Sequence, residues 1–268
     1  MRIGFIGTGA MASAIARGAV AAGFSGSDLM FADRHRQAAE DLADELGGIA
    51  LASNRQVAEQ SNLLVLAVKP NVQSEVIREI RESVLFAKQL CVVSIAAGRT
   101  TDQIISDFGA AIPLVRVMPN VNAQIGKSMS ALCPMGTTDE QLAAARKLLD
   151  SVGQTIVLDE KYFPVFTAIA SSSPAWIFRM IDAMAEAGVN HGLTKADSTR
   201  IVTQAFLGSA QLMLNGLENG QVPANFIDRV SSPGGTTIAG LLAAQEAGLS
   251  SAIVAAVDAA VERDHHLG

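Results

Sequence analysis

The beginning of the chain changes from one hydrophobic period to another within a single glycine-rich turn. The apolar run Arg2–Gly7 is typical of a buried strand, and Ala10–Ala22, with apolar residues three to four apart, is typical of a helix. The turn between them has the form G-x-G-x-x-A, which allows a tight bend and lets a pyrophosphate approach the backbone. This arrangement predicts a dinucleotide site rather than a plain tight turn. The expected cofactor-binding residues are Gly7, Thr8, Gly9, Ala10 and Met11.

Strands and helices continue to alternate as far as Glu160. Further strands are expected at Asp28–Asp33, Leu63–Val68, Leu90–Ile95, Ile112–Val117, Ser130–Cys133 and Gln154–Leu158. This alternation favours a parallel, doubly wound sheet. After Glu160 only helices are expected. The predicted fold class is therefore α/β, with a Rossmann-like dinucleotide-binding domain over residues 1–160 and an all-α domain over residues 161–268.

The expected helix Lys195–Gly216 is apolar on several of its sides. A helix that is apolar nearly all round is usually buried, but a helical domain of this size has little interior. We therefore expect a second subunit to cover it, which makes the protein a homo-oligomer, either a dimer or an assembly of dimers. The alternative is a helix sandwiched within one chain.

Charge and cysteine content exclude several classes of protein. The formal net charge is −6, with 20 basic and 26 acidic residues, and no basic run occurs. Binding to nucleic acid or to an anionic membrane is therefore not expected. The two cysteines are too few for a disulfide framework or a cysteine-rich zinc site. No segment resembles a membrane span or a signal peptide, so a cytoplasmic location is expected.

The end of the second expected strand reads Ala32-Asp33-Arg34-His35-Arg36. In folds of this type, that position selects between the nicotinamide dinucleotides. Asp33 would accept from a ribose 2′-hydroxyl and repel a 2′-phosphate, whereas Arg34 and Arg36 would pair with the phosphate. Two arginines against one aspartate favour NADP(H), with NAD(H) also accepted. The alternative is a solvated loop with no role in binding.

Residues typical of strong acid, base or nucleophilic chemistry are missing from the expected site. The four histidines fall in loops or in the terminal tail, and neither a metal-ligand spacing nor a G-x-S-x-G elbow occurs. No metal site is predicted. Such an inventory suits a reaction in which the cofactor carries the difficult step and the protein orients the substrate. Hydride addition to an electrophilic C=N bond is a reaction of this kind.

Several segments, in order along nearly the whole chain, resemble the pyrroline-5-carboxylate reductase family. They are Ala67–Pro70, Ser94–Gly98, Arg116–Asn120 and, most specifically, Val230–Leu241 with the sequence VSSPGGTTIAGL. The resemblance implies reduction of 1-pyrroline-5-carboxylate to L-proline, the last step of proline synthesis, and a helical half that serves dimerisation and substrate binding. It also implies further cofactor-binding residues, namely Asn54, Ala67, Val68, Lys69, Pro70, Met118, Pro119 and Asn120.

The same resemblance assigns the substrate to the turn that precedes Ile238. Two glycines and a proline in this turn, followed by a helix, would form an anion site for the substrate carboxylate without any Arg or Lys. A simple helix-capping turn is the alternative. Thr237 is expected near the ring nitrogen as the catalytic residue. The expected substrate-binding residues are Ser232, Gly234, Gly235, Thr236 and Thr237.

One segment departs from the family pattern. Members usually carry a Gly-Ser-Gly-Pro-Ala-Tyr-like segment, whereas this chain has Ser171-Ser172-Ser173-Pro174-Ala175-Trp176. Two other functions stay open at this point. One is a related reductase that acts on another cyclic imine or on a hydroxy acid. A hydroxy-acid dehydrogenase would be expected to use a lysine in the helical domain, where only Lys195 follows Lys161. A dinucleotide sensor without catalysis would share the fold but has no need of a site for a substrate carboxylate.

Overall fold

The computed structural model describes residues 1–87 and 89–266, and Lys88, Leu267 and Gly268 lie outside the described part. The chain divides into two compact units. The first contains Met1–Ser171 together with the last part of the chain from Ala260, and the second contains Ser172–Ala259. By packing, residues 161–171 group with the first unit. Packing alone does not test the domain boundary expected after Glu160, which stays a prediction.

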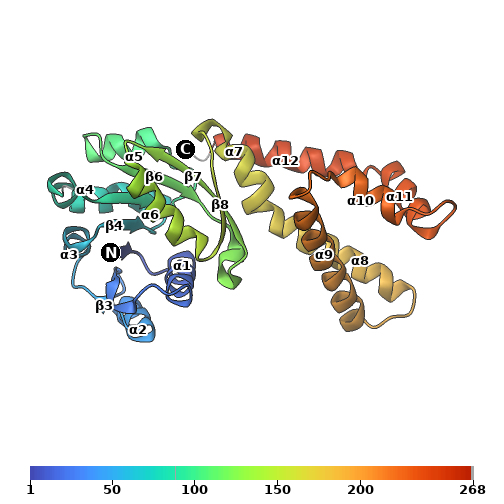
Figure 1. Ribbon diagram of the computed structural model, residues 1–268, viewed down its shortest axis with the longest axis horizontal. Coiled ribbons are helices and arrows are strands. Elements are labelled where there is room, and N and C mark those ends of the chain that lie inside the picture. Colours follow the sequence, from blue (N-terminus) through green and yellow to red (C-terminus); the bar gives the residue numbers. More distant parts are fainter. Residues whose placement is uncertain (88, 267–268) are drawn as a thin grey trace. The chain divides into compact units, whose positions relative to one another are not determined.

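The first unit is built on one sheet, which has the strand order β3-β2-β1-β4-β5-β6-β7-β8 among the described residues. The order reverses between β1 and β4, as in a doubly wound fold. Figure 1 labels β3 and β4 and, further along the sheet, β6, β7 and β8. The strands are β1 Ile3–Ile6, β2 Leu29–Ala32, β3 Ile49–Ala50, β4 Leu63–Leu66, β5 Cys91–Ser94, β6 Leu114–Met118, β7 Ser128–Met135 and β8 Gly153–Val157.

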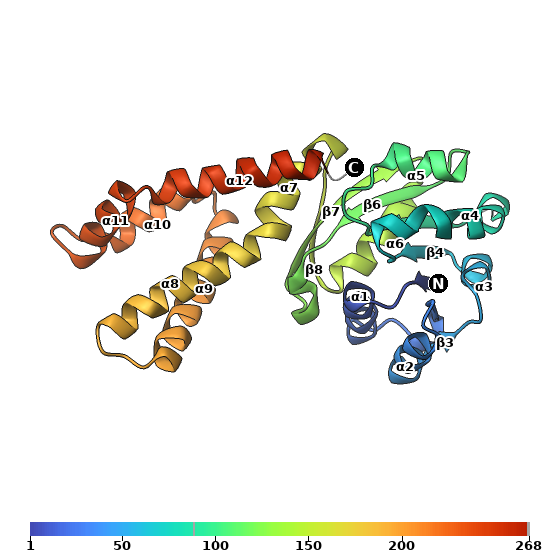
Figure 2. The same ribbon diagram turned by 180° about the vertical axis from the view of Figure 1, so that it is seen from behind.

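Helices cover both faces of this sheet, because alternate strand residues point to opposite sides. In β1, Ile3 and Phe5 belong to one apolar core with α1, α2 and α6, whereas Ile6 belongs to the other core with α3, α4 and α5. Figure 2 shows α3, α4 and α5 following one another along one side of the sheet. The helices are α1 Ala10–Ala21, α2 Arg36–Leu46, α3 Asn54–Gln60, α4 Pro70–Phe86, α5 Thr101–Phe108 and α6 Asp139–Asp150, with short 3₁₀ turns η1 Gly26–Asp28 and η2 Val121–Ile125.

The sheet departs from the expected parallel order at one pair, since β6 and β7 are antiparallel. They are joined through the short turn η2, which ends at Gly126 with φ +67°. A parallel pair needs a crossover of about a dozen residues or more, and this connection is too short for one. Two short elements, β3 and α3, were not expected either. A two-residue strand shows no alternation, and α3 begins where the Ser53 hydroxyl accepts from the Gln56 N–H.

A partly buried ion pair links β6 to the segment that follows the sheet. Arg116 in β6 donates to Glu160 Oε1 at 2.6 Å, and the backbone N–H and hydroxyl of Thr101 each donate to the same carboxylate at 2.7 Å. The Arg116 guanidinium also lies 4.4 Å from the ring centroid of Phe163. Three elements thus meet at Glu160, which begins the 3₁₀ turn η3 Glu160–Tyr162. α7 Phe163–Phe166 and the π-helix η4 Thr167–Ser172 come next.

The second unit is helical throughout its described residues and buries few of its apolar side chains. α8 packs against α9, yet Ile201 and Leu207 on α9 are 56% and 62% exposed. The alternative of a helix sandwiched within a single chain is therefore wrong. The helices are α8 Ser173–Asn190, α9 Lys195–Leu217, α10 Pro223–Val230, α11 Thr236–Glu246 and α12 Leu249–His265, the last of which crosses the division between the units.

Among the described residues, no single helix has the length and hydropathy needed to cross a membrane. The bent pair Thr236–Glu246 and Leu249–Asp264 meets the length and composition criteria only when both are counted together.

The Glu160 ion pair leads to a prediction about stability and its pH dependence. Burial opposes ionisation of Glu160, but hydrogen bonds from Thr101 and Arg116 outweigh it and hold the pKa of the carboxyl below its ordinary value. Glu160→Gln leaves Arg116, whose side chain is 8% exposed, without its counter-charge. We expect a loss of about 3 kcal/mol in the free energy of unfolding at pH 7, measured by urea denaturation.

The sign of the pH effect follows from the lowered pKa. The stability that ionised Glu160 contributes is present above about pH 4.3, the ordinary pKa of glutamate, and is lost as the pH falls below it. The difference between wild type and Glu160→Gln should therefore shrink between pH 7 and pH 3.5. Glu82→Gln, at an exposed position on α4, is the control. Equal stability of Glu160→Gln and Glu82→Gln at pH 7 would contradict the role of the pair.

Candidate functional site

The two glycines of the first turn are needed for different physical reasons. Gly7 has φ +95°, and a Cβ placed there would lie 2.9 Å from the carbonyl oxygen of Ala67. Gly9 has an ordinary φ of −66°, and a Cβ there would meet no atom within 4 Å. Backbone conformation thus explains Gly7, whereas Gly9 leaves open space in front of α1. No side chain caps α1. The open space and the uncapped helix start fit a pyrophosphate.

A cavity of about 250 Å³ lies beside this turn, at the carboxyl ends of β1, β2 and β4. It brings together eight of the expected cofactor-binding residues: Gly7, Gly9, Asp33, Arg34, Asn54, Ala67, Val68 and Lys69. Four further residues line it that sequence reasoning missed: Ile6, His35, Val72 and Val76. The signal for two of these was available, because Val72 and Val76 are four residues apart and share one face of α4.

The remaining expected residues of this half have other places. The Thr8 backbone N–H donates a hydrogen bond to the Asp33 carboxylate. Pro70 is the first residue of α4, and Met11 lies in the first turn of α1. Ala10 lines a separate hollow of about 510 Å³ between α1 and η2. Met118–Asn120 form the end of β6 and the residues just after it.

Asp33 holds the glycine-rich turn from within the protein. Its Oδ2 accepts from the Thr8 N–H at 2.8 Å and the Thr8 hydroxyl at 3.1 Å, and its Oδ1 accepts from the His35 N–H at 2.9 Å. Burial alone would raise its pKa, but these hydrogen bonds from His35 and Thr8 outweigh burial and lower it. Sequence reasoning missed this role, because it needs the ends of β1 and β2 side by side.

The positively charged side chains near the cavity differ in whether a partner within the protein already neutralises them. Arg36 Nε is paired with Glu40 at 2.6 Å on α2 and does not line the cavity. Arg34 lines it, and within the described part of the chain its side chain donates only to the neighbouring His35 ring, at 3.2 Å. Lys69 lines the cavity as an exposed side chain. Asn54 donates to Glu79 at 2.7 Å. Arg34 and Lys69 are thus the cations placed to meet a phosphate at this cavity.

The candidate substrate turn belongs to the second unit and stands at the start of α11. Gly234 has φ +66°, a conformation that favours glycine, and a Cβ on Gly235 would lie 2.3 Å from the Ser232 hydroxyl, so a larger residue there would displace that side chain. Gly235 is the N-cap, with no side-chain acceptor for the first N–H groups of α11. The exposed Thr236 and Thr237 add hydroxyls at the same end. The turn therefore has the features of an anion site formed by backbone N–H groups.

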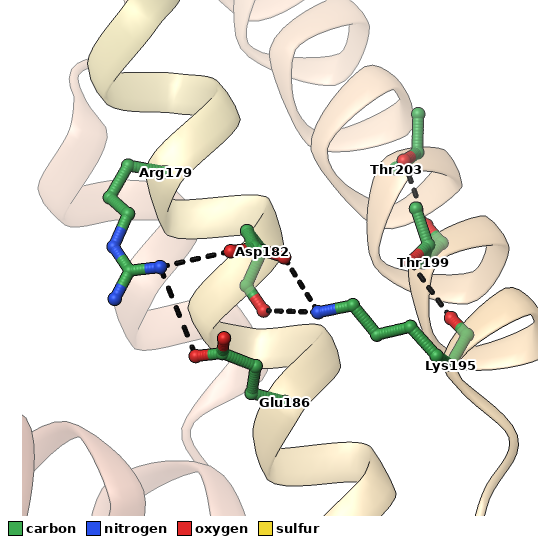
Figure 3. Close-up of polar contacts among 6 residues, drawn as sticks. All are labelled: Arg179, Asp182, Glu186, Lys195, Thr199 and Thr203. Carbon is green, nitrogen blue, oxygen red and sulfur yellow. Dashed lines mark hydrogen bonds and ion pairs between the residues drawn. The ribbon is translucent and has the colours of Figure 1, made fainter.

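Residues outside these two places offer little for catalysis. Lys195 Nζ lies 2.6 Å from Asp182 Oδ1 and 3.3 Å from the Asp182 carbonyl oxygen, and Asp182 also pairs with Arg179, as Figure 3 shows. Burial raises the pKa of the Cys91 thiol to about 12 and also raises that of Cys133. Within residues 1–87 and 89–266, no group of three or more His, Cys, Asp or Glu side chains is arranged to hold a metal ion.

The role of Asp33 can be separated from simple recognition of a ribose hydroxyl. If Asp33 acts by holding Thr8, Asp33→Ala should weaken the binding of NADH and NADPH together, each by roughly tenfold for a lost charged hydrogen bond. If it bonded only a 2′-hydroxyl, NADH binding would weaken while NADPH binding strengthened. Fluorescence titration of both dinucleotides decides between these results. Asp44→Ala, an exposed carboxylate on α2, is the matched control.

Comparison with known proteins covers both units. Residues 2–98 match the model described as NADP oxidoreductase coenzyme F420-dependent, and residues 160–267 match the one described as pyrroline-5-carboxylate reductase dimerisation. The pyrroline-5-carboxylate reductases of Corynebacterium melassecola and Escherichia coli K12 are each 34% identical to this chain, and the matches cover 99% of this chain and 98% of each relative.

Solved structures agree with these matches. A pyrroline-5-carboxylate reductase from Coxiella burnetii is 30% identical with a TM-score of 0.93, covering 100% of this chain and 98% of that one. The enzyme from Streptococcus pyogenes is 36% identical with a TM-score of 0.84, covering 99% and 98%. The chain therefore belongs to the pyrroline-5-carboxylate reductase family, oxidoreductases that reduce pyrroline-5-carboxylate to proline.

Proposed function

We propose that this protein reduces 1-pyrroline-5-carboxylate to L-proline by hydride transfer from NAD(P)H, with NADP(H) preferred and NAD(H) accepted. The observation that supports this best is the cavity at Gly7 and Gly9, which lies at the reversal of strand order in a chain of this family. The bound nicotinamide supplies the hydride, and the protein supplies position and electrostatic complementarity.

In this proposal the adenosine half of the dinucleotide binds over one half of the sheet and the nicotinamide half binds over the other. The backbone N–H groups at the start of α1 hold the pyrophosphate. Arg34 and Lys69, with Asn54 nearby, hold the adenosine side, and Arg34 gives the preference for a 2′-phosphate. Met118–Asn120, at the carboxyl end of β6, adjoin the nicotinamide.

The cyclic imine binds at the turn Ser232–Thr237. Its carboxylate accepts hydrogen bonds from the first N–H groups of α11 and from the neighbouring hydroxyls, which suits a helix start with no side-chain cap of its own. The Thr237 hydroxyl lies near the ring nitrogen and assists the protonation that accompanies amine formation. No strong acid or base is required, because an imine of this kind is readily protonated before the hydride arrives.

The protein works as a homodimer or as an assembly of dimers in the cytoplasm. The large apolar side chains that α8 and α9 leave exposed support this assembly, among them Phe178, Met184, Leu212 and Leu217. Burying such side chains against a second copy would remove apolar surface from water, which favours association.

The two alternative functions predict different behaviour. A hydroxy-acid dehydrogenase would use the lysine of the helical half, but Lys195 is held by Asp182. A dinucleotide sensor would bind NADPH without turnover. The Gly234 and Gly235 geometry, which forms an anion site that a sensor does not need, favours the reductase.

The activity and the cofactor preference are tested together by following NADPH and NADH absorbance on addition of pyrroline-5-carboxylate. Oxidation of either cofactor supports the reductase, whereas NADPH binding without oxidation would favour the sensor. We expect Arg34→Ala to raise the KM for NADPH by about tenfold and to leave the KM for NADH nearly unchanged. Arg78→Ala, an exposed arginine on α4, controls for the change in net charge. An equal effect on both cofactors would contradict the assignment of Arg34.

The role of Thr237 is tested at the level of turnover. We expect Thr237→Ala to lower kcat by about 10- to 100-fold, the range for one hydrogen bond to a charged group, while the NADPH dissociation constant stays the same. Thr237→Ser keeps the hydroxyl and should retain most of the activity. Unchanged kcat in Thr237→Ala would remove this residue from the mechanism.

A further inference from the structure

Two reciprocal hydrogen bonds join the end of β6 to the π-helix Thr167–Ser172. The Asn120 side-chain amide donates to the Ala170 carbonyl oxygen at 2.9 Å, and the Ser171 hydroxyl donates to the Pro119 carbonyl oxygen at 3.0 Å. Each segment thus contributes one side chain and one backbone carbonyl. All four residues belong to the first unit. We call this pair of bonds the β6–π clasp.

Both the side chain and the backbone of Asn120 are hydrogen-bonded within the protein, which makes the clasp rigid. It is 6% exposed, its Oδ1 accepts from the Asn122 N–H at 3.1 Å, and its own N–H donates to the Ser128 hydroxyl at 3.2 Å. The Asn120 carbonyl accepts from the Ala123 N–H at 3.1 Å. A buried polar side chain with all its groups satisfied fixes one local conformation.

The Ser171 hydroxyl is the part of the clasp that glycine would not supply. A glycine at this position would have no side chain to reach Pro119. π-Helical turns are rare and often occur at functional sites. Here such a turn presents the Ser171 hydroxyl to the Pro119 carbonyl oxygen and the Ala170 carbonyl to the side-chain amide of the next residue, Asn120. The clasp therefore has one bond that depends on the particular residue in this chain.

The position of the clasp relates it to the reaction. β6 lies in the half of the sheet beyond the reversal between β1 and β4, and a dinucleotide that crosses this reversal extends its second half over the carboxyl ends of β4 to β6. The backbone at Pro119 and Asn120 is then next to the nicotinamide. This step rests on the proposed function.

We propose that Ser171 is a positioning residue for hydride transfer. It touches neither the nicotinamide nor the imine, and acts through the Pro119 carbonyl, which together with Asn120 fixes the backbone against the nicotinamide ring. Small errors in the approach of donor and acceptor slow such a transfer strongly, and a 1 Å displacement costs on the order of 100-fold. Loss of one of the two bonds should have a smaller effect.

The test compares Ser171→Ala and Ser171→Gly with wild type in the full-length enzyme. Hydride transfer is followed in a single turnover with saturating pyrroline-5-carboxylate, using NADPH and NADPH deuterated at the transferred position. We expect both variants to slow the transfer by about fivefold, which corresponds to one neutral hydrogen bond. We also expect the isotope effect on kcat to rise. NADPH affinity and the thermal midpoint should change little.

Two further variants separate positioning from a general structural effect. Ser171→Thr keeps the hydroxyl and should restore the rate of transfer. Ser106→Ala makes the same chemical change at an exposed position on α5 and should leave it at the wild-type value. A rate in Ser171→Ala equal to wild type would overturn the proposal, as would a Ser171→Thr rate as low as that of Ser171→Ala.

These outcomes are distinct from failure of the proposed function. If the wild type oxidises no NADPH with this substrate, the reductase activity is absent and the positioning role falls with it. If the wild type turns over and the Ser171 variants do the same at equal rates, the positioning role alone is overturned.

Discussion

The close approach of the first turn to the end of β4 is the constraint on which the cofactor site depends. Gly7 leaves β1 with a positive φ, and its Cα lies so near the Ala67 carbonyl that no side chain fits between them. This contact requires β1 and β4 to end at the same level, which their parallel register provides. Asp33, at the end of β2, then holds Thr8 from the other side. The space in front of Gly9 is therefore a consequence of three strand ends that meet at one edge.

Local patterns predicted the alternation of strands and helices, because a short apolar run followed by glycine has few ways to fold. They also predicted Gly7, Gly9, Asp33 and Arg34 at the cavity, whereas the resemblance to the family predicted Asn54 and Ala67–Lys69. Contacts between distant segments were not predictable from such patterns. The bonds from Asp33 to Thr8 depend on strand pairing, and the antiparallel β7 depends on a connection too short for a crossover. The β6–π clasp pairs Asn120 with Ala170 and Ser171 with Pro119, positions about fifty residues apart, and no local period reveals it.

The helical half shows a different limit of sequence reasoning. The all-round apolar character of α9 indicated burial, but within one chain Leu207 stays 62% exposed. The pattern therefore reports on the assembled protein rather than on the single chain. Because Lys195 at the start of α9 also contacts Asp182 in the middle of α8, the pairing of the two helices does not depend on the apolar faces alone. Those faces remain available to a second copy.

The helix starts explain how an acidic chain can hold anions. α3, α5, α6 and α9 begin with a Ser or Thr side chain that accepts from their own first turn. α1 and α11 begin instead at Gly9 and Gly235, with no such acceptor. A capped helix has already satisfied one of its free N–H groups, whereas an uncapped start keeps them for a ligand. The proposed function puts the pyrophosphate and the substrate carboxylate at these two glycine starts, where helix dipoles would supply the positive potential that a chain of net charge −6 lacks overall.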